Sequence, residues 1–142
     1  MSMVDIGLLI LRVVLGLLFI GHGSQKLFGW FGGPGLQGIA GWFGASGLRP
    51  ASFWAFMAAI AELGGGLLLT LGLLNPLGSI GITASMFMAI VMVHWPRVWV
   101  TENGLEYPLV NMAAAIGLAL IGPGLYSLDA SYGLGLPMPA TL

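Results

Sequence analysis

Four long apolar stretches alternate with shorter polar or glycine-rich connections along the chain. The apolar stretches cover residues 6–23, 53–74, 77–95 and 108–121. An α-helix of roughly 20 apolar residues is long enough to cross a bilayer core of about 30 Å. The pattern therefore predicts an all-α polytopic membrane protein, an antiparallel bundle of four transmembrane helices that forms a single integral-membrane domain over residues 1–142.

Helix-breaking and capping residues mark the ends of these stretches. The second stretch follows Pro50 and a candidate N-cap at Ser52, and it stops before Asn75 and Pro76. Pro96 ends the third stretch. Proline cannot continue a helix interior, because it lacks a backbone N–H and clashes with the preceding turn. We therefore expect separate helices with sharp ends.

The connection between the first two stretches, residues 24–51, is neither uniformly apolar nor charged. It is rich in glycine, and its aromatic side chains are Phe28, Trp30, Phe31, Trp42 and Phe43. Aromatic residues concentrate at membrane–water interfaces. We expect an interfacial or re-entrant segment here, with a short amphipathic helix over residues 36–45. The alternative is an ordinary glycine-rich loop within an aromatic belt.

Two ionisable residues, Arg12 and Glu62, lie inside apolar stretches. Such groups are costly in hydrocarbon, so they normally face the protein interior and have a partner. Counting about 1.5 Å per residue along antiparallel helices places both about 15 Å from the same membrane face. This predicts a buried ion pair that either holds the helices or passes protons. Gly16 and Gly23 share a face with Arg12, which predicts close approach of a neighbouring helix.

A second group of polar residues is expected at one end of the bundle. His22 and Lys26 end the first helix, His94 ends the third, and Glu106 and Asn111 begin the fourth. These ends meet at one face of an antiparallel bundle, so the five side chains are expected to converge and to bind a ligand. Histidine titrates near physiological pH. Donors and acceptors of this kind, below an aromatic-rich loop, suit the head group of a lipophilic quinone or phenol.

Each of these residues also has a purely structural interpretation. Lys26 can extend to the lipid headgroups, and His22 can complement the helix dipole. His94 can anchor the interface, and Asn111 can hold neighbouring helices together. We predict no metal site. A metal held by His22, His94 and Glu106 lacks support, and a haem between the two histidines is disfavoured because other helices intervene.

Composition agrees with the membrane assignment and narrows the chemistry. Hydrophobic residues make up 58% of the chain and charged residues 6%, whereas soluble domains carry roughly 25% charged residues. The lipid bilayer is thus the first expected partner. A net charge of -1 with four Lys and Arg residues argues against a nucleic-acid partner. The absence of cysteine excludes disulfides and thiolate metal sites, so any redox role requires a bound or partner-supplied cofactor.

The basic residues outside the apolar stretches predict an orientation. Lys26, Arg49 and Arg97 belong to the face at which the first and third helices end. Cytoplasmic loops carry an excess of Lys and Arg. We therefore expect the face with His22 and His94 to be cytoplasmic and both termini to be external.

Several short motifs follow one another in a recognisable order. They are an arginine in the first helix followed by Gly21-His22-Gly23-Ser24-Gln25-Lys26-Leu27, Glu62 before Gly64-Gly65-Gly66, His94, Asn103-Gly104-Leu105-Glu106-Tyr107-Pro108, and Gly122-Pro123-Gly124 leading to Ser127-Leu128-Asp129. In this order and spacing they resemble the DoxX family of small four-span bacterial membrane proteins. The resemblance covers nearly the whole chain.

The resemblance implies a bacterial inner-membrane protein connected with thiosulfate:quinone oxidation, quinone and catechol detoxification or protection against oxidative stress. We therefore expect a quinone-linked oxidoreductase component, or a subunit that binds a lipophilic quinone or phenol, with a redox partner protein. The predicted catalytic residues are His22, Lys26, Glu62 and His94. In this hypothesis the histidines hydrogen-bond the ligand oxygens, Lys26 stabilises a negatively charged reduced form, and Glu62 passes protons.

A non-catalytic role stays open beside this one. Distant eukaryotic relatives act as membrane cargo receptors, and a fold does not dictate one chemistry. The protein could be a scaffold that recruits a partner protein, a carrier of a small lipophile or a transporter. Four short spans make a small transporter unless the chain forms a homo-oligomer.

Overall fold

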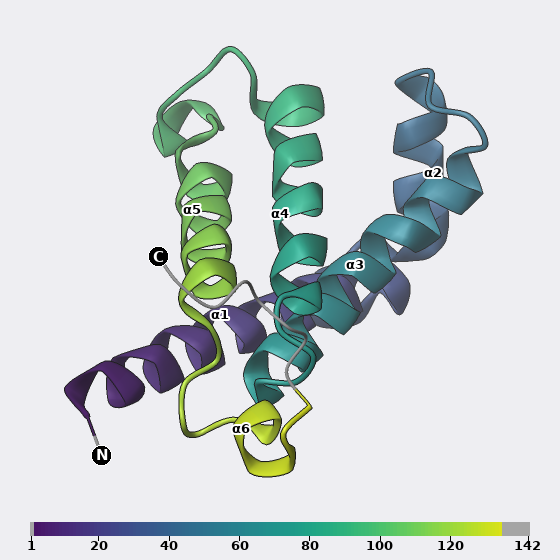
Figure 1. Ribbon diagram of the computed structural model, residues 1–142. Coiled ribbons are helices and arrows are strands. Elements are labelled where there is room, and N and C mark those ends of the chain that lie inside the picture. Colours follow the sequence, from purple (N-terminus) through teal and green to yellow (C-terminus); the bar gives the residue numbers. More distant parts are fainter. Residues whose placement is uncertain (1, 135–142) are drawn as a thin grey trace.

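The computed structural model describes residues 2–134 and consists of helices and their connections (Figure 1). Its elements are α1 (Met3–Leu27), the 3-10 helix η1 (Trp30–Gly32), α2 (Gly35–Ala45), α3 (Ala51–Leu71), α4 (Leu77–Ala89), the π-helix η2 (Ile90–His94), the 3-10 helix η3 (Val100–Glu102), α5 (Glu106–Ile121) and α6 (Leu128–Tyr132). No β-strand occurs among the described residues, which confirms the all-α prediction for them. The predicted domain also includes residues 1 and 135–142, which lie outside this part of the chain.

Three helices in residues 2–134 are long and apolar enough to cross a membrane: α1, α3 and the continuous unit of α4 and η2. α5 is equally apolar in character but has 16 residues. The long helices expose many large apolar side chains, among them Leu17, Leu67 and Ile80. Exposure of so much apolar surface to water is unfavourable, whereas contact of the same surface with lipid is not. The chain is a membrane protein.

The end of α3 shows how long-range contacts adjust a local pattern. The apolar stretch predicts a helix that continues to Leu74, but α3 ends at Leu71 because Gly72 adopts a left-handed conformation with a φ of 63°. The backbone N–H groups of Leu74 and Asn75 then donate to the carboxylate of Asp129 at 2.7 and 2.8 Å. That carboxylate comes from α6, which no local pattern connects to this turn.

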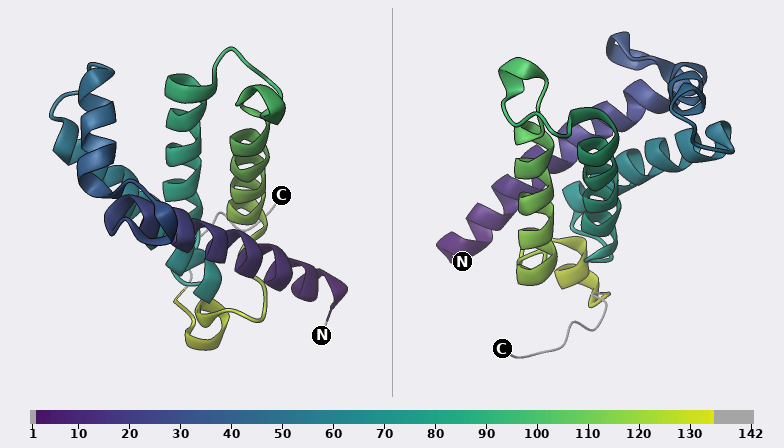
Figure 2. Two further views of the ribbon diagram at one scale, coloured as in Figure 1. Left: turned by 180° about the vertical axis from the view of Figure 1, so that it is seen from behind. Right: turned by 90° about the horizontal axis from the view of Figure 1, so that it is seen from above.

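α1 and α3 lie side by side in opposite directions (Figures 1 and 2). Glycine allows their backbones to touch. A Cβ atom on Gly66 would lie 2.6 Å from the backbone nitrogen of Ile20, and one on Gly23 would overlap the backbone of Leu63. Gly16 lies at the same interface, so the predicted small-residue face of α1 is confirmed.

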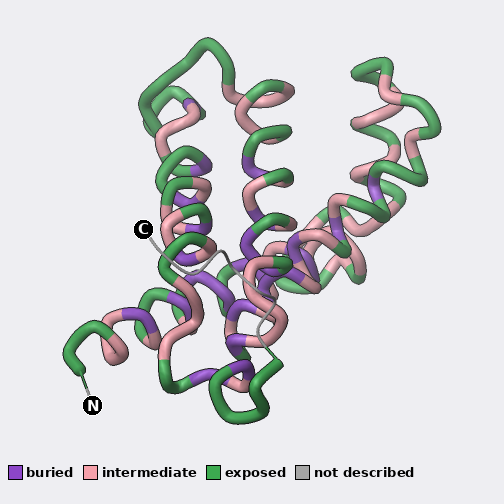
Figure 3. The backbone as a smooth tube through the Cα atoms, in the orientation of Figure 1, coloured by how far each residue is buried: buried purple, intermediate pink, exposed green. Residues whose placement is uncertain are grey.

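α4 and α5 form a second antiparallel pair, which crosses the α1–α3 pair obliquely (Figure 2). The buried segments of the four helices lie where the two pairs approach each other (Figure 3). The core there consists of Leu8, Leu15, Phe19, Leu69, Ile82, Met86, Ala115 and Leu118. Two crossing pairs make a more open arrangement than the regular bundle that the pattern predicts.

α3 and α4 touch near one end and separate toward the other (Figure 1). A Cβ atom on Gly65 would lie 2.9 Å from the carbonyl oxygen of Gly78, and one on Gly81 would lie 2.9 Å from that of Ala61. Beyond these contacts the start of α3 and the end of α4 diverge. α2 packs on the start of α3. The space between α2, α3 and α4 is the main feature of the site described next.

Candidate functional site

A groove of about 500 Å³ lies where α3 and α4 diverge, with α2 as a third wall. Most of its lining is apolar and includes Ile39, Trp42, Phe43, Trp54, Met57, Met88 and Met92. Its polar side chains are Lys26, Glu62, Ser85 and His94. Small-molecule sites are typically mostly apolar clefts of about 300–1,000 Å³ with a few polar groups. This space, called the α2–α4 groove below, has that size and composition.

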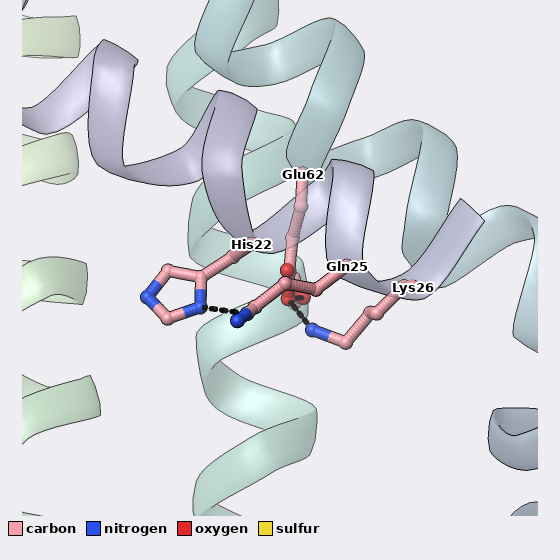
Figure 4. Close-up of polar contacts among 5 residues, drawn as sticks. His22, Gln25, Lys26 and Glu62 are labelled. Carbon is pink, nitrogen blue, oxygen red and sulfur yellow. Dashed lines mark hydrogen bonds and ion pairs between the residues drawn. The ribbon is translucent and has the colours of Figure 1, made fainter. Parts of the chain in front are cut away.

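Lys26, Glu62 and Ser85 form a polar cluster in the groove, the Glu62 cluster. The Lys26 Nζ and the Ser85 Oγ each donate to Oε1 of Glu62 at 2.5 Å. The Glu62 side chain is 1% exposed and that of Lys26 is 26% exposed, so the carboxylate is buried and the ammonium remains partly accessible. Figure 4 shows the ammonium directed at the carboxylate from α1.

The second carboxylate oxygen of Glu62 accepts no hydrogen bond within the cluster. Oε2 of Glu62 is buried and has no hydrogen-bond partner among the described residues. A carboxylate can accept hydrogen bonds on both oxygens. The cluster therefore retains one unsatisfied acceptor on a side chain that lines the groove.

Close backbone contacts bring the three members of the cluster together. Gly23 lies against Leu63, which sets the last turn of α1 on α3 next to the carboxylate. Gly81 lies against Ala61, which sets α4 on α3 about one turn before the serine. Three helices thus each contribute one polar side chain to one point of an otherwise apolar surface.

His94 lines the same groove and belongs to the π-helix η2. The Trp95 N–H donates to the carbonyl oxygen of Ile90 at 2.8 Å, an i→i+5 bond that widens the last turn. Nδ1 of His94 lies 2.8 Å from the carbonyl oxygen of Asn103. A carbonyl only accepts, so Nδ1 carries the hydrogen, and Nε2 of the neutral ring is then an acceptor.

His22 lies away from the groove. Its Nδ1 is 3.2 Å from Oε1 of Gln25, and its ring is next to that of Phe19, with 5.8 Å between centroids. The ring extends away from the Glu62 cluster (Figure 4). The structure therefore brings Lys26 and His94 to one groove, as expected, but it does not bring His22 to it.

Glu106 and Asn111 also lie outside the residues that line the groove. A carboxylate oxygen of Glu106 accepts from the Val100 N–H at 2.9 Å and thereby holds the connection before α5. Asn111 is buried within α5. Within residues 2–134, no three His, Asp or Glu side chains are grouped so that they could hold a metal ion. The alternative of a metal on His22, His94 and Glu106 therefore has no ligand set.

The predicted ion pair between Arg12 and Glu62 is wrong. Glu62 binds Lys26, and the Arg12 guanidinium donates to the carbonyl oxygens of Pro123 and, at 2.5 Å, Tyr126. The burial of both charged groups was expected correctly, since each is almost inaccessible. Their partners were not.

The error arises from the assumed level of the two helices. Counting residues from one membrane face assumes that α1 ends and α3 begins at that face. In the structure α3 extends beyond the end of α1, and α2 covers that extension. The residue opposite Arg12 is Gly72, which directly follows the end of α3 and whose Cβ would lie 2.8 Å from the Arg12 Cζ. Gly72 follows Glu62 by roughly three helical turns.

Two parts of the site were missed by the sequence analysis. Ser85 is one of two serines in the apolar helix α4, and a hydroxyl in such a helix often hydrogen-bonds to a neighbouring helix. That signal was available but does not name the partner. The role of Trp42 and Phe43 as one wall of the groove depends on the packing of α2 against α3, which no local pattern indicates.

Comparison with known proteins gives a consistent assignment. The DoxX family model matches residues 7–95, a range that includes every polar residue of the groove. A protein of Bacillus subtilis (strain 168) named "Putative oxidoreductase CatD" is 32% identical over 125 residues, which cover 88% of this chain and 86% of that protein. No solved structure matches this chain. From the family match and this relative, the chain belongs to the DoxX family.

Proposed function

We propose that this protein binds a lipophilic quinone or phenol in the α2–α4 groove and serves as a quinone-linked component of a membrane oxidoreductase system. The observation that carries the proposal is an apolar, aromatic-lined groove with a Lys26–Glu62 ion pair, of which the carboxylate is buried, at one point of its wall. The name of the Bacillus subtilis relative supports the class of reaction.

The lining fits both parts of such a ligand. Trp42 and Trp54 offer flat faces on which an aromatic ring can stack. Met88 and Met92 are flexible and fill irregular space around a tail. Lys26 can donate to a ring oxygen, because two of its three ammonium hydrogens are not used by Glu62.

A bound quinone would supply the electron transfer, and the chain itself would bind the ring, exclude water and hold protons at Lys26 and Glu62. The chain has no cysteine. Electrons would therefore be exchanged with a redox partner protein or a further bound cofactor, as the sequence leads us to expect.

The proposal includes an arrangement in the bacterial inner membrane. α1, α3, the α4–η2 unit and α5 cross it as four antiparallel spans, and α2 with its flanking loops is the interfacial segment. Lys26, Arg49 and Arg97 make the side that carries α2 and His94 cytoplasmic. The groove then opens toward the cytoplasmic leaflet, where a lipophilic ligand can enter from the bilayer.

Binding can be tested with the tryptophans of the groove as probes. We expect decylubiquinone to quench the fluorescence of the detergent-purified protein saturably. Ala84→Phe should weaken this binding at least about tenfold, because Ala84 lines the groove and the added ring would occupy it. Ala113→Phe is the matched control, since Ala113 is an exposed alanine of α5 outside the groove. Equal affinity of the two variants would contradict the proposal.

A further inference from the structure

The polar groups of the α2–α4 groove include donors and acceptors, and one of the acceptors is buried and unsatisfied. Oε2 of Glu62 is buried without a partner. Nε2 of His94 is an acceptor in the neutral ring, because Nδ1 donates to the Asn103 carbonyl. Ser85 adds no donor, since its hydroxyl hydrogen is already directed to Oε1 of Glu62. Lys26 is therefore the donor that the cluster leaves to a ligand.

An unsatisfied acceptor in a buried place discriminates between ligands. A buried polar group without a hydrogen bond costs free energy, more so when it is charged. A ligand hydroxyl placed at Glu62 would satisfy Oε2. A ligand carbonyl or ether oxygen in the same place could accept from Lys26, but it has no hydrogen to donate and would leave Oε2 unsatisfied.

Lys26 is the mobile member of the ion pair. The Glu62 side chain is 1% exposed, whereas the side chain of Lys26, which donates to Oε1, is 26% exposed. Lysine has a flexible stem of four carbons and rotatable donors. It can move to admit a hydroxyl and then donate to the oxygen of that same hydroxyl. One hydroxyl thus matches both members of the ion pair.

We infer that Glu62 is a specificity-determining residue that makes the groove select the hydroxylated form of an aromatic ligand, a phenol or hydroquinone, over the corresponding carbonyl or ether. This inference rests on the proposed function and names the form of the ligand that the same groove holds. Glu62 accepts the hydrogen bond of the ligand hydroxyl through Oε2, and Lys26 donates to the hydroxyl oxygen.

The test uses two redox-inert ligands that differ only at the hydroxyl, para-hexylphenol and its methyl ether. Their affinities are measured on the purified protein by competition against decylubiquinone quenching. We expect the phenol to bind at least about tenfold more tightly, since it can donate to the charged carboxylate and the ether cannot; tenfold corresponds to about 1.4 kcal/mol.

Two variants test whether the preference for the phenol depends on Oε2 of Glu62. In Glu62→Gln the amide oxygen can take the place of Oε1 beside Lys26 and Ser85, which leaves an NH₂ donor where Oε2 was. We expect the preference for the phenol to fall to about twofold or less. Glu102→Gln is the matched control: Glu102 is exposed and lies outside the groove lining, so this variant should retain the preference.

The outcomes separate this inference from the proposed function. Equal binding of phenol and ether to the native protein would overturn the inference and leave a groove that binds lipophiles. Failure of decylubiquinone and both ligands to bind would overturn the proposed function and the inference with it. If Glu62→Gln does not fold, the double variant Lys26→Met/Glu62→Gln, which leaves no buried charge unpaired, takes its place: a preference for the phenol that persists there would contradict an effect of Oε2.

Discussion

Lys26 compensates a carboxylate that is almost completely buried. Transfer of an unpaired ionised carboxylate into a low-dielectric interior costs several kcal/mol even after the protein relaxes. Removal of one member of a buried ion pair destabilises a protein by a comparable amount. Lys26 is partly exposed, so it keeps some hydration while it donates to Glu62. Loss of the lysine should therefore harm the fold more than loss of both charges.

We predict that Lys26→Met lowers the free energy of unfolding by about 3–5 kcal/mol, because Glu62 is left as a buried, uncompensated charge. The double variant Lys26→Met/Glu62→Gln should recover most of this loss. Denaturant or thermal unfolding in detergent measures both. Arg97→Met is the control for removal of an exposed basic side chain. An equal loss in the single and double variants would show that the pair does not compensate a buried charge.

Arg12 marks the limit of sequence reasoning for single residues. An arginine in the middle of an apolar helix must be buried with a partner, and the structure agrees. The sequence suggests a carboxylate as that partner, since an acidic residue within an apolar stretch can be identified directly in the sequence. The structure uses the carbonyl oxygens of Pro123 and Tyr126. Every residue has a carbonyl, so the sequence contains no signal that singles out these two.

The helices themselves were largely predictable, because apolar runs and helix-breaking residues are local features. The widened turn of η2 was not, since a π-helix differs from an α-helix by one hydrogen-bond step that leaves little trace in hydrophobic periodicity. The relative level of α1 and α3 was not predictable either. It is fixed by contacts such as that of Gly66 with Ile20.

The glycine interface of α1 and α3 gives a prediction with an internal control. A Cβ on Gly66 would lie 2.7 Å from the Gly16 carbonyl oxygen, whereas one on Gly64 meets nothing within 4 Å. Alanine has the higher helix propensity at both positions, by about 1 kcal/mol. We predict that Gly66→Ala lowers the thermal midpoint by several degrees through overpacking of about 1–3 kcal/mol, and that Gly64→Ala does not. Equal thermal midpoints of the two variants would show that α1 and α3 can move apart at Gly66 without loss of stability.

For the molecule as a whole, the groove was the part that the sequence could not predict. Its walls come from α2, α3 and the α4–η2 unit, and its Lys26–Glu62 ion pair requires α1 as well. Lys26, His94 and His22 all lie at helix ends, so the sequence predicts that they converge, but only Lys26 and His94 line the groove. Which side of a helix faces which neighbour depends on the angle between the two helix pairs, and no motif records that angle.

The orientation of the whole chain can be tested because it has no native cysteine. Ser46 lies next to α2, and Ala130 lies in α6; both are exposed. In cells, a membrane-impermeant thiol reagent should label Ala130→Cys from outside, and Ser46→Cys only after the cytoplasmic face is opened. The reason is the excess of basic residues on the α2 side. Labelling of Ser46→Cys in intact cells would reverse the orientation.

α3 and α4 contact each other closely at two places, Gly65 with Gly78 and Gly81 with Ala61, and they diverge beyond these contacts. From Gly78 to His94 the α4–η2 unit extends for about 24 Å, at 1.5 Å per residue. At that length a difference of about 5° in the angle between α3 and α4 corresponds to about 2 Å at His94. The width of the groove thus depends on how closely these glycines let the two backbones approach, so a larger residue at Gly78 or Gly81 would reshape the groove without altering any side chain that lines it.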